Sequence, residues 1–395
     1  MPSGTLPAPT GRYRVGRAAY HWIDEARAEP SAVDEKRELV CWIWYPAEPA
    51  EDTQPAPYLP VGWEAVGQFW GFDAESAHGH AFTDAPVDPD RDTYPVLVFS
   101  AAGFPPLSLS AILEDIASHG YVIVGINHTY ESILTVFPDG RVAPMNTEFM
   151  QPVFGPYSGE AQVAIDGRAA IVRQKVADMR FVAERVAALN EGTGPLAGRL
   201  DLSRVGAFGH SMGGDAALEY CRASEDCRAA ANLDGGIWGE VGRVGLERPT
   251  LLVLADHTDI RTPCEEHVKV GLYPSVEWCE AERAVMVNGW QTAYERGRPG
   301  YALMMRGAVH ASFMDAPFLP LQPGSMLAGG MTAATIDSER AWRITCDALL
   351  AFFGAHLDGE PATFFDAPFP TDEAVLGPPR SLLLGEPAAG EHPRR

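Results

Sequence analysis

Ser211 is the residue whose sequence surroundings most clearly suggest covalent chemistry. It lies in Gly209-His210-Ser211-Met212-Gly213, which fits the pattern G-x-S-x-G. In enzymes with this pattern a strand ends in a sharp turn that raises the serine above a sheet, and a helix begins directly after it. The glycines let the backbone pass without a Cβ clash, and the first helical amides face a developing oxyanion. The alternative is that Ser211 is only a small residue in a glycine-rich turn.

A serine hydroxyl needs a base, and the base needs an orienting carboxylate. After such a serine the expected chain order is acid and then histidine, each at the carboxyl end of a strand. His310, in RGAVHASF, directly follows the last predicted core strand and is the expected base, whereas His257 comes too early to leave room for an acid. Two candidates for the acid remain open, because Asp234 ends the strand RAAANLD and Asp256 ends the strand PTLLVLAD.

Strand and helix patterns alternate from residue 93 onward, which is typical of a parallel sheet with helices on both faces. The predicted core strands are 94–103, 121–127, 204–209, 228–234, 249–256 and 301–307. The predicted helices are 109–120, 158–192, 211–221 and 338–357. Residues 11–22 and 37–47 are expected to form an antiparallel pair at the N-terminal edge. The fold class is therefore predicted to be α/β, with a mostly parallel twisted sheet that carries helices on both faces.

The chain contains no linker sharp enough to separate a second domain, so we expect residues 1–357 to form one domain. Residues 48–92 are rich in Pro, Asp and aromatic side chains and are predicted to be an irregular excursion. The interval around 260–295 is a candidate lid over the site. Residues 358–395 contain repeated Pro and Gly and are predicted to be an extended C-terminal tail.

The composition is strongly acidic, with 53 Asp and Glu against 30 Lys and Arg, which gives a net charge of −23. Such a surface repels phosphate backbones and anionic membranes, so we expect no nucleic acid partner. No apolar run reaches the roughly 18 residues that span a bilayer, which argues against integral membrane association. The first residues lack the apolar segment of a secretory signal, so the expected location is cytoplasmic, or secreted if a leader was removed.

Cofactor and metal signals are weak in this sequence. There is no glycine-rich phosphate loop or dinucleotide fingerprint, and we expect neither a cofactor nor a metal. None of the six cysteines forms a C-x-x-C pair. Cys264 and Cys279 flank a presumed loop, and they are candidates for a disulfide if the compartment is oxidising.

Four segments of the chain resemble the platelet-activating-factor acetylhydrolase family, the secreted and type II enzymes among the α/β-hydrolases. They are RELVCWIWYPA, PVLVFSAAGF with DIASHGYVIVGINHTYE, VGAFGHSMGGDAA, and NLDGGIW with VHASFMD downstream. Their order and spacing span most of residues 11–357 and are more specific than G-x-S-x-G alone. The resemblance implies that Asp234 is the acid and His310 the base, with Asp256 as the alternative acid.

Two backbone amides are expected to bind the oxyanion. The first is the N–H of Met212 at the start of the helix. In the loop after the first core strand, relatives usually carry His-Gly where this chain has Ala101-Ala102-Gly103-Phe104. Because a backbone N–H does not depend on the side chain, the resemblance implies that Gly103 or Phe104 supplies the second donor.

The sequence therefore predicts a serine ester hydrolase that cleaves a short or medium acyl ester of a small-molecule or lipid-like substrate. His210, Phe149, Met150 and Phe154 are the residues expected to line the substrate pocket. One alternative keeps the acyl-enzyme but transfers the acyl group to an alcohol or amine, as in an acyltransferase or a cyclising enzyme. Another alternative is a catalytically inactive binding protein on the same fold.

Overall fold

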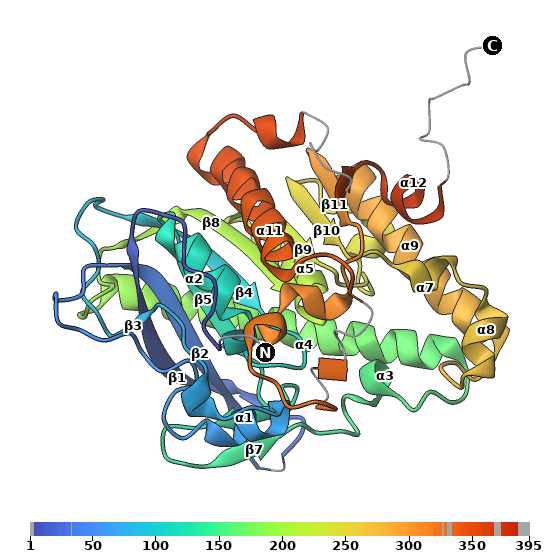
Figure 1. Ribbon diagram of the computed structural model, residues 1–395, viewed down its shortest axis with the longest axis horizontal. Coiled ribbons are helices and arrows are strands. Elements are labelled where there is room, and N and C mark those ends of the chain that lie inside the picture. The colour runs from blue at the N-terminus through green and yellow to red at the C-terminus, as the bar shows by residue number, and fades with distance from the viewer. Residues whose placement is uncertain (1–3, 33, 326–327, 330–333, 367–372, 386–395) are drawn as a thin grey trace.

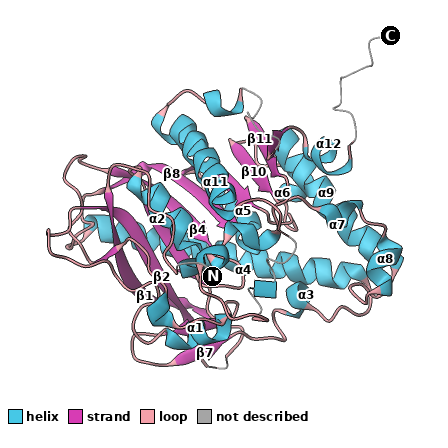
Figure 2. Ribbon diagram, in the orientation of Figure 1, coloured by secondary structure: helices cyan, strands magenta, loops and turns pink. Residues whose placement is uncertain are grey.

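The computed structural model of the chain describes residues 4–32, 34–325, 328–329, 334–366 and 373–385. A large sheet lies at its centre and helices cover both faces (Figure 1, Figure 2). The strands are β1 (Arg14–Ala28), β2 (Lys36–Ala47), β3 (Phe82–Thr83), β4 (Tyr94–Ser100), β5 (Val122–Asn127), β6 (Leu134–Val136), β7 (Val142–Pro144), β8 (Leu200–His210), β9 (Cys227–Leu233), β10 (Thr250–Leu254), β11 (Gly300–Met305) and β12 (Ala374–Leu376).

The described strands of the main sheet follow the order β12-β11-β10-β9-β8-β4-β5-β2-β1-β3. The six central strands from β11 to β5 are parallel to one another. β2 pairs antiparallel with β5, and β1 pairs antiparallel with β2. The predicted mostly parallel sheet, with an antiparallel pair toward its N-terminal edge, is therefore confirmed.

The helices are α1 (Glu64–Trp70), α2 (Ser110–Ser118), α3 (Gln151–Phe154), α4 (Ala161–Glu191), α5 (Met212–Ala223), α6 (Val241–Val244), α7 (Thr258–Arg261), α8 (Cys264–Lys269), α9 (Val276–Arg296), α11 (Ser338–Phe353) and α12 (Pro379–Leu384). Short 3₁₀ turns span Ala74–Ser76, Pro106–Leu109, His310–Phe313, Ala316–Phe318 and Thr363–Phe365, and α11 ends in a π turn, Gly354–Asp358.

Two apolar clusters hold the helices on the sheet, one on each face. Along β4, Val96 and Val98 face the cluster that contains residues of α4 and α5, whereas Leu97 and Phe99 face the cluster with residues of α2 and α11. All residues of β4 are buried. Its continuous apolar sequence is thus explained, because successive side chains of a strand point to opposite faces and both faces are covered.

The predicted excursion and lid both contain regular structure. Residues 48–92 form α1, a 3₁₀ turn and β3, and Trp63, Trp70 and Phe72 from this segment are buried in the core. Residues 260–295 lie mostly in α7, α8 and α9. The second half of α9 is a crossover helix between β10 and β11, and its Trp290 is fully buried against the sheet, so only the first part of this interval remains a candidate lid.

The predicted extended tail is wrong for the part of it that the structure describes. β12 adds an antiparallel strand beside β11, and α12 packs on α9 with Leu383 fully buried. The repeated prolines and glycines indicated an extended chain, because β12, with three residues, and α12, with six, are too short to give a periodic apolar pattern. Residues 367–372 and 386–395 lie outside the described residues.

Two disulfides link neighbouring elements. Cys264 and Cys279 join α8 to α9, as predicted, and a second, unpredicted disulfide between Cys221 and Cys227 joins the end of α5 to β9. Cys41 and Cys346 are buried free thiols. Disulfides of this kind persist in oxidising compartments.

We expect thiol titration of the denatured, unreduced protein to find two thiols per chain, from Cys41 and Cys346. After reduction the same titration should find all six cysteines. Six thiols before reduction would show that neither disulfide forms in the purified protein.

No helix in the described part of the chain is both long enough and apolar enough to cross a membrane.

Candidate active site

Ser211 joins the end of β8 to the start of α5, so it lies in the strand–turn–helix context that the motif requires. Its φ of 58° and ψ of −131° are rare for a residue with a side chain. Neighbouring glycines make this turn possible. A Cβ on Gly209 would lie 2.2 Å from the carbonyl oxygen of Gly213, and a Cβ on Gly235 would lie 2.0 Å from that of Ser211.

Asp234 follows β9 directly and is buried beside the site. One carboxylate oxygen, Oδ2, lies 2.7 Å from Nδ1 of His310. The other, Oδ1, accepts the backbone N–H of Ala255 at 2.7 Å and lies 2.8 Å from Nε2 of His257. Burial alone raises the pKa of Asp234, but the charges and hydrogen bonds of His257 and His310 outweigh it. The pKa of this carboxyl is therefore held well below its usual range.

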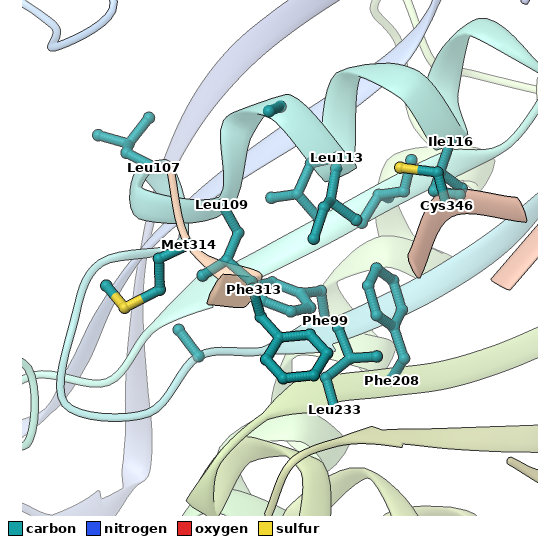
Figure 3. Close-up of a cluster of buried hydrophobic side chains, with 14 of the residues drawn as sticks. Phe99, Leu107, Leu109, Leu113, Ile116, Phe208, Leu233, Phe313, Met314 and Cys346 are labelled. Atoms are coloured by element: carbon teal, nitrogen blue, oxygen red, sulfur yellow. The ribbon is translucent and has the colours of Figure 1, made fainter. Parts of the chain in front are cut away.

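His310 begins the 3₁₀ turn that follows β11, and its side chain is about half exposed at 51%. The turn is fixed on the core by the residues after the histidine. Phe313 lies among Phe99, Leu109 and Leu233 in the cluster on that face of the sheet (Figure 3). The carboxylate of Asp315 accepts the N–H of Ala111 at 3.0 Å and the hydroxyl of Tyr58 at 2.9 Å. The segment VHASFMD thus positions its histidine through an apolar and a polar anchor.

Asp256, the alternative acid, does not meet His310. Its Oδ2 accepts the backbone N–H of Gly307 at 3.0 Å, and its Oδ1 pairs with Arg261. Its own N–H donates to the carbonyl of Ala308 at 3.1 Å. This carboxylate therefore braces the turn that leads from β11 to His310, and the structure brings Asp234, not Asp256, to the histidine.

His210 is buried beneath His310 rather than placed in a substrate pocket, so this expectation is wrong. Its Nε2 lies 3.1 Å from the carbonyl oxygen of His310, and the two imidazole rings are 4.5 Å apart between centroids. It is the last residue of β8, and its ring also lies 5.8 Å from that of Phe313 between centroids. Burial, followed by the neighbouring His310, lowers its pKa to about 3.

This low pKa predicts a loss of stability in mild acid. In the unfolded chain His210 is protonated below its ordinary pKa of 6.5, whereas in the folded protein it stays neutral until the pH approaches its lowered pKa of about 3. Its contribution to stability is therefore complete above pH 6.5 and is lost as the pH falls toward 3. Between pH 7 and pH 5 the loss is about 2 kcal/mol.

The check is to compare chemical denaturation of the wild type and His210→Gln at both pH values. Glutamine keeps a hydrogen-bond donor but does not titrate, so its stability should fall less between pH 7 and pH 5. Equal falls in the two proteins would contradict the low pKa of His210.

One cavity of about 410 Å³ brings the candidate residues together. Ser211, Asp234 and His310 line it, and so does Met212. The remaining wall consists of Val153, Arg168, Gly236, Trp238, Ala255, Asp256, His257, Glu282, Met286, Ala308 and Val309. A cavity of this size is within the range of sites that bind small molecules.

Phe149, Met150 and Phe154 do not line this cavity, contrary to expectation. Met150 is buried in the core against α4, and the ring of Phe154 packs on Gly103 at the rim of the loop after β4. The short helix α3 causes this difference, because it turns Val153 toward the cavity. Two further cavity-lining residues were not predicted from the sequence. Arg168 of α4 and Glu282 of α9 form a buried ion pair in the cavity wall.

The loop after β4 is held from below by a buried lysine. Nζ of Lys175 donates to the carbonyl oxygens of Ala101 at 3.1 Å and of Ala102 at 3.5 Å. Because C=O and N–H point in opposite directions across a trans peptide, the N–H groups of Ala102 and Gly103 point away from Lys175. The N–H of Met212 lies at the first turn of α5, and Phe104 packs against the core beside Trp70.

A second Ser–His–Asp array lies in the interior. Nε2 of His128 is 2.9 Å from Oγ of Ser100, and its Nδ1 is 2.8 Å from Oδ2 of Asp178. All three side chains are buried, and they line none of the larger cavities in the described residues. Arg37 also binds Asp178, so this array is a structural ion cluster with no access to substrate.

A larger cavity of about 1050 Å³ runs along α4 beside α5 and α6. It shares Trp238 with the smaller cavity but contains none of the candidate catalytic residues. Of these two cavities, the smaller one is therefore the candidate active site.

The chain is similar to proteins of known description. A family model described as platelet-activating factor acetylhydrolase, isoform II, matches residues 2–363. A curated protein of Arthroderma benhamiae, a probable 1-alkyl-2-acetylglycerophosphocholine esterase, is 26% identical over 263 residues, which cover 61% of each chain. A solved ferulic acid esterase from Streptomyces cinnamoneus is 27% identical and has a TM-score of 0.74, over 95% of this chain and 99% of that one. The chain thus has the α/β-hydrolase fold and belongs to the platelet-activating factor acetylhydrolase, isoform II, family.

Proposed function

We propose that this protein is a serine ester hydrolase in which Ser211 is the nucleophile, His310 the general base and Asp234 the acid that orients the base. The observation that carries the proposal is the hydrogen-bonded pair of His310 and Asp234 on the same cavity as a serine in a strained turn. Family membership supports it.

The proposed reaction proceeds through an acyl-enzyme. Nε2 of His310 takes the proton of Ser211 as Oγ attacks the ester carbonyl carbon, and a tetrahedral intermediate forms. The N–H of Met212 and an N–H at Gly103 or Phe104 bind its oxyanion, and each such donor is worth roughly 3 kcal/mol. His310 then protonates the departing alcohol. Water, deprotonated by His310, attacks the acyl group and releases the acid, which regenerates Ser211.

The proposed substrate is a short or medium acyl ester of a small or lipid-like alcohol. The apolar part of the cavity wall, which includes Val153, Trp238 and Met286, suits such an acyl group. The Arthroderma benhamiae relative is described as an esterase of an acetylglycerophosphocholine, and this description supports a short acyl chain in the proposed substrate. The net charge of −23 disfavours anionic substrates at long range.

Labelling with a fluorophosphonate followed by peptide mapping tests the nucleophile. The adduct should be confined to the peptide that contains Ser211, and an excess of a p-nitrophenyl ester should slow its formation. An adduct at any other serine contradicts the assignment.

A substrate series tests the acyl preference. We expect kcat/KM to be highest for acetyl and other short p-nitrophenyl esters, and lower for methyl ferulate, the substrate type suggested by the name of the structural relative. Product analysis in the presence of added alcohols should find mainly the free acid. Dominant transfer to the alcohol would instead identify an acyltransferase.

A further inference from the structure

Asp234 carries two histidines, one on each carboxylate oxygen. His310 is bound at Oδ2 and His257 at Oδ1, with distances of 2.7 and 2.8 Å. In the usual serine hydrolase triad, the carboxylate orients a single imidazole. The second histidine is therefore an addition to the arrangement in the proposed mechanism.

His257 is held rigidly in this place. Its side chain is largely buried at 13% exposure, and its ring lies against Trp290 with centroids 5.1 Å apart. The indole N–H of Trp290 donates to the carbonyl of Gly235 at 2.7 Å, directly beside the turn that holds Ser211. The backbone N–H of His257 also contacts the carbonyl of Ala255 at 3.0 Å, so both ends of the residue are fixed.

The shared carboxylate determines where the protons lie. Ionised Asp234 only accepts, so each histidine must present an N–H to it. For His310 this is the Nδ1–H, which leaves Nε2 free to accept the serine proton. For His257 it is the Nε2–H. With donors at both oxygens and the N–H of Ala255 at Oδ1, rotation of the carboxylate about its Cβ–Cγ bond breaks at least two hydrogen bonds.

We propose that His257 is a positioning residue, which locks the carboxylate plane of Asp234 and thereby the ring of His310. This inference rests on the proposed function of Ser211, His310 and Asp234. His257 acts through Asp234, and its donated hydrogen bond is the property that matters. A donor at the same place should therefore substitute for it, whereas a ring of similar size without a donor should not.

The test compares His257→Phe with His257→Gln, whose amide nitrogen reaches the position of Nε2. We expect His257→Phe to lower kcat by about 10- to 100-fold with little change in KM, because a misoriented base slows the chemical step rather than binding. His257→Gln should recover most of kcat. Equal activity of His257→Phe and the wild type overturns the proposal, and so does an equal loss in both variants.

A matched control and an independent signal separate this result from simpler causes. His356→Phe replaces another partly buried histidine, which packs on Tyr301 and does not line the smaller cavity, and it should keep wild-type kcat. The low-field NMR signal of the Nδ1–H of His310 should broaden in His257→Phe and persist in His257→Gln. If the wild type neither hydrolyses esters nor reacts with the fluorophosphonate, the proposed function itself fails. If the wild type is active and His257→Phe is unaffected, only the role of His257 fails.

Discussion

Replacing Ser211 with alanine is expected to lower kcat/KM for p-nitrophenyl esters by about 10⁴-fold or more, because no nucleophile remains to form the acyl-enzyme. Fluorophosphonate labelling should disappear in the same variant. The measurement is steady-state hydrolysis at several enzyme concentrations, with thermal unfolding to show that the variant folds.

Ser203→Ala is the matched control for this experiment. Ser203 lies on the same strand, β8, but its hydroxyl is bonded to Asp201 at an exposed position away from the cavity. Activity should therefore be unchanged in Ser203→Ala. Retention of more than a trace of activity in Ser211→Ala, or loss of activity in Ser203→Ala, contradicts the assigned nucleophile.

Arg37→Met is expected to destabilise the folded protein by about 3–5 kcal/mol, which is the usual cost of removing one partner of a buried ion cluster. The guanidinium of Arg37 is fully buried and binds three carboxylates, those of Asp178, Glu29 and Glu131. Burial alone lowers the pKa of Arg37, but these carboxylates outweigh it and raise the pKa above its usual value. Without Arg37, negative charges remain in the interior, and among the described residues Lys175 and the partly exposed Arg27 are the Lys and Arg side chains still paired with them.

The stability change is measured as a shift of the thermal or denaturant midpoint. Arg243→Met provides the control, because the pair of Arg243 and Glu240 lies on the surface with both side chains more than half exposed. Surface pairs of this kind contribute little to stability. Similar midpoints for Arg37→Met and Arg243→Met would show that the buried cluster contributes no more to stability than a surface ion pair does.

The parts of the fold that follow from local pattern could be predicted from sequence. β4 and β10 are buried on both faces and appear as unbroken apolar runs, and the alternation with α4 and α5 then implies a parallel sheet. The turn at Ser211 could also be predicted, because Gly209 and Gly213 both lie within the motif and a Cβ on Gly209 would meet the carbonyl of Gly213. Each of these features depends on residues that are near one another in the chain.

Features set by contacts between distant segments could not be predicted in this way. Asp234 and Asp256 end adjacent strands, and only the partners Arg261 and Gly307 show that Asp256 is already bonded elsewhere. His257 was rejected on its chain position, yet the pairing of β9 with β10 places it beside Asp234. The sole local signal for it was a histidine directly after a strand end. The prediction of the pocket-lining residues was wrong for a similar reason, because α3 determines which side of residues 149–154 faces the cavity.

The two outermost strands, β3 and β12, contain only two and three residues. A parallel sheet that ended at β11 would present a row of unpaired amides and carbonyls along an apolar strand, which is a template for pairing with other chains. β12 covers part of that row, and the N–H of Arg306 just beyond β11 donates to the carbonyl of Glu373. We therefore expect the segment after α11 to limit edge-to-edge aggregation, and we expect a chain cut at residue 357 to be less soluble even where its fold and its cavity survive.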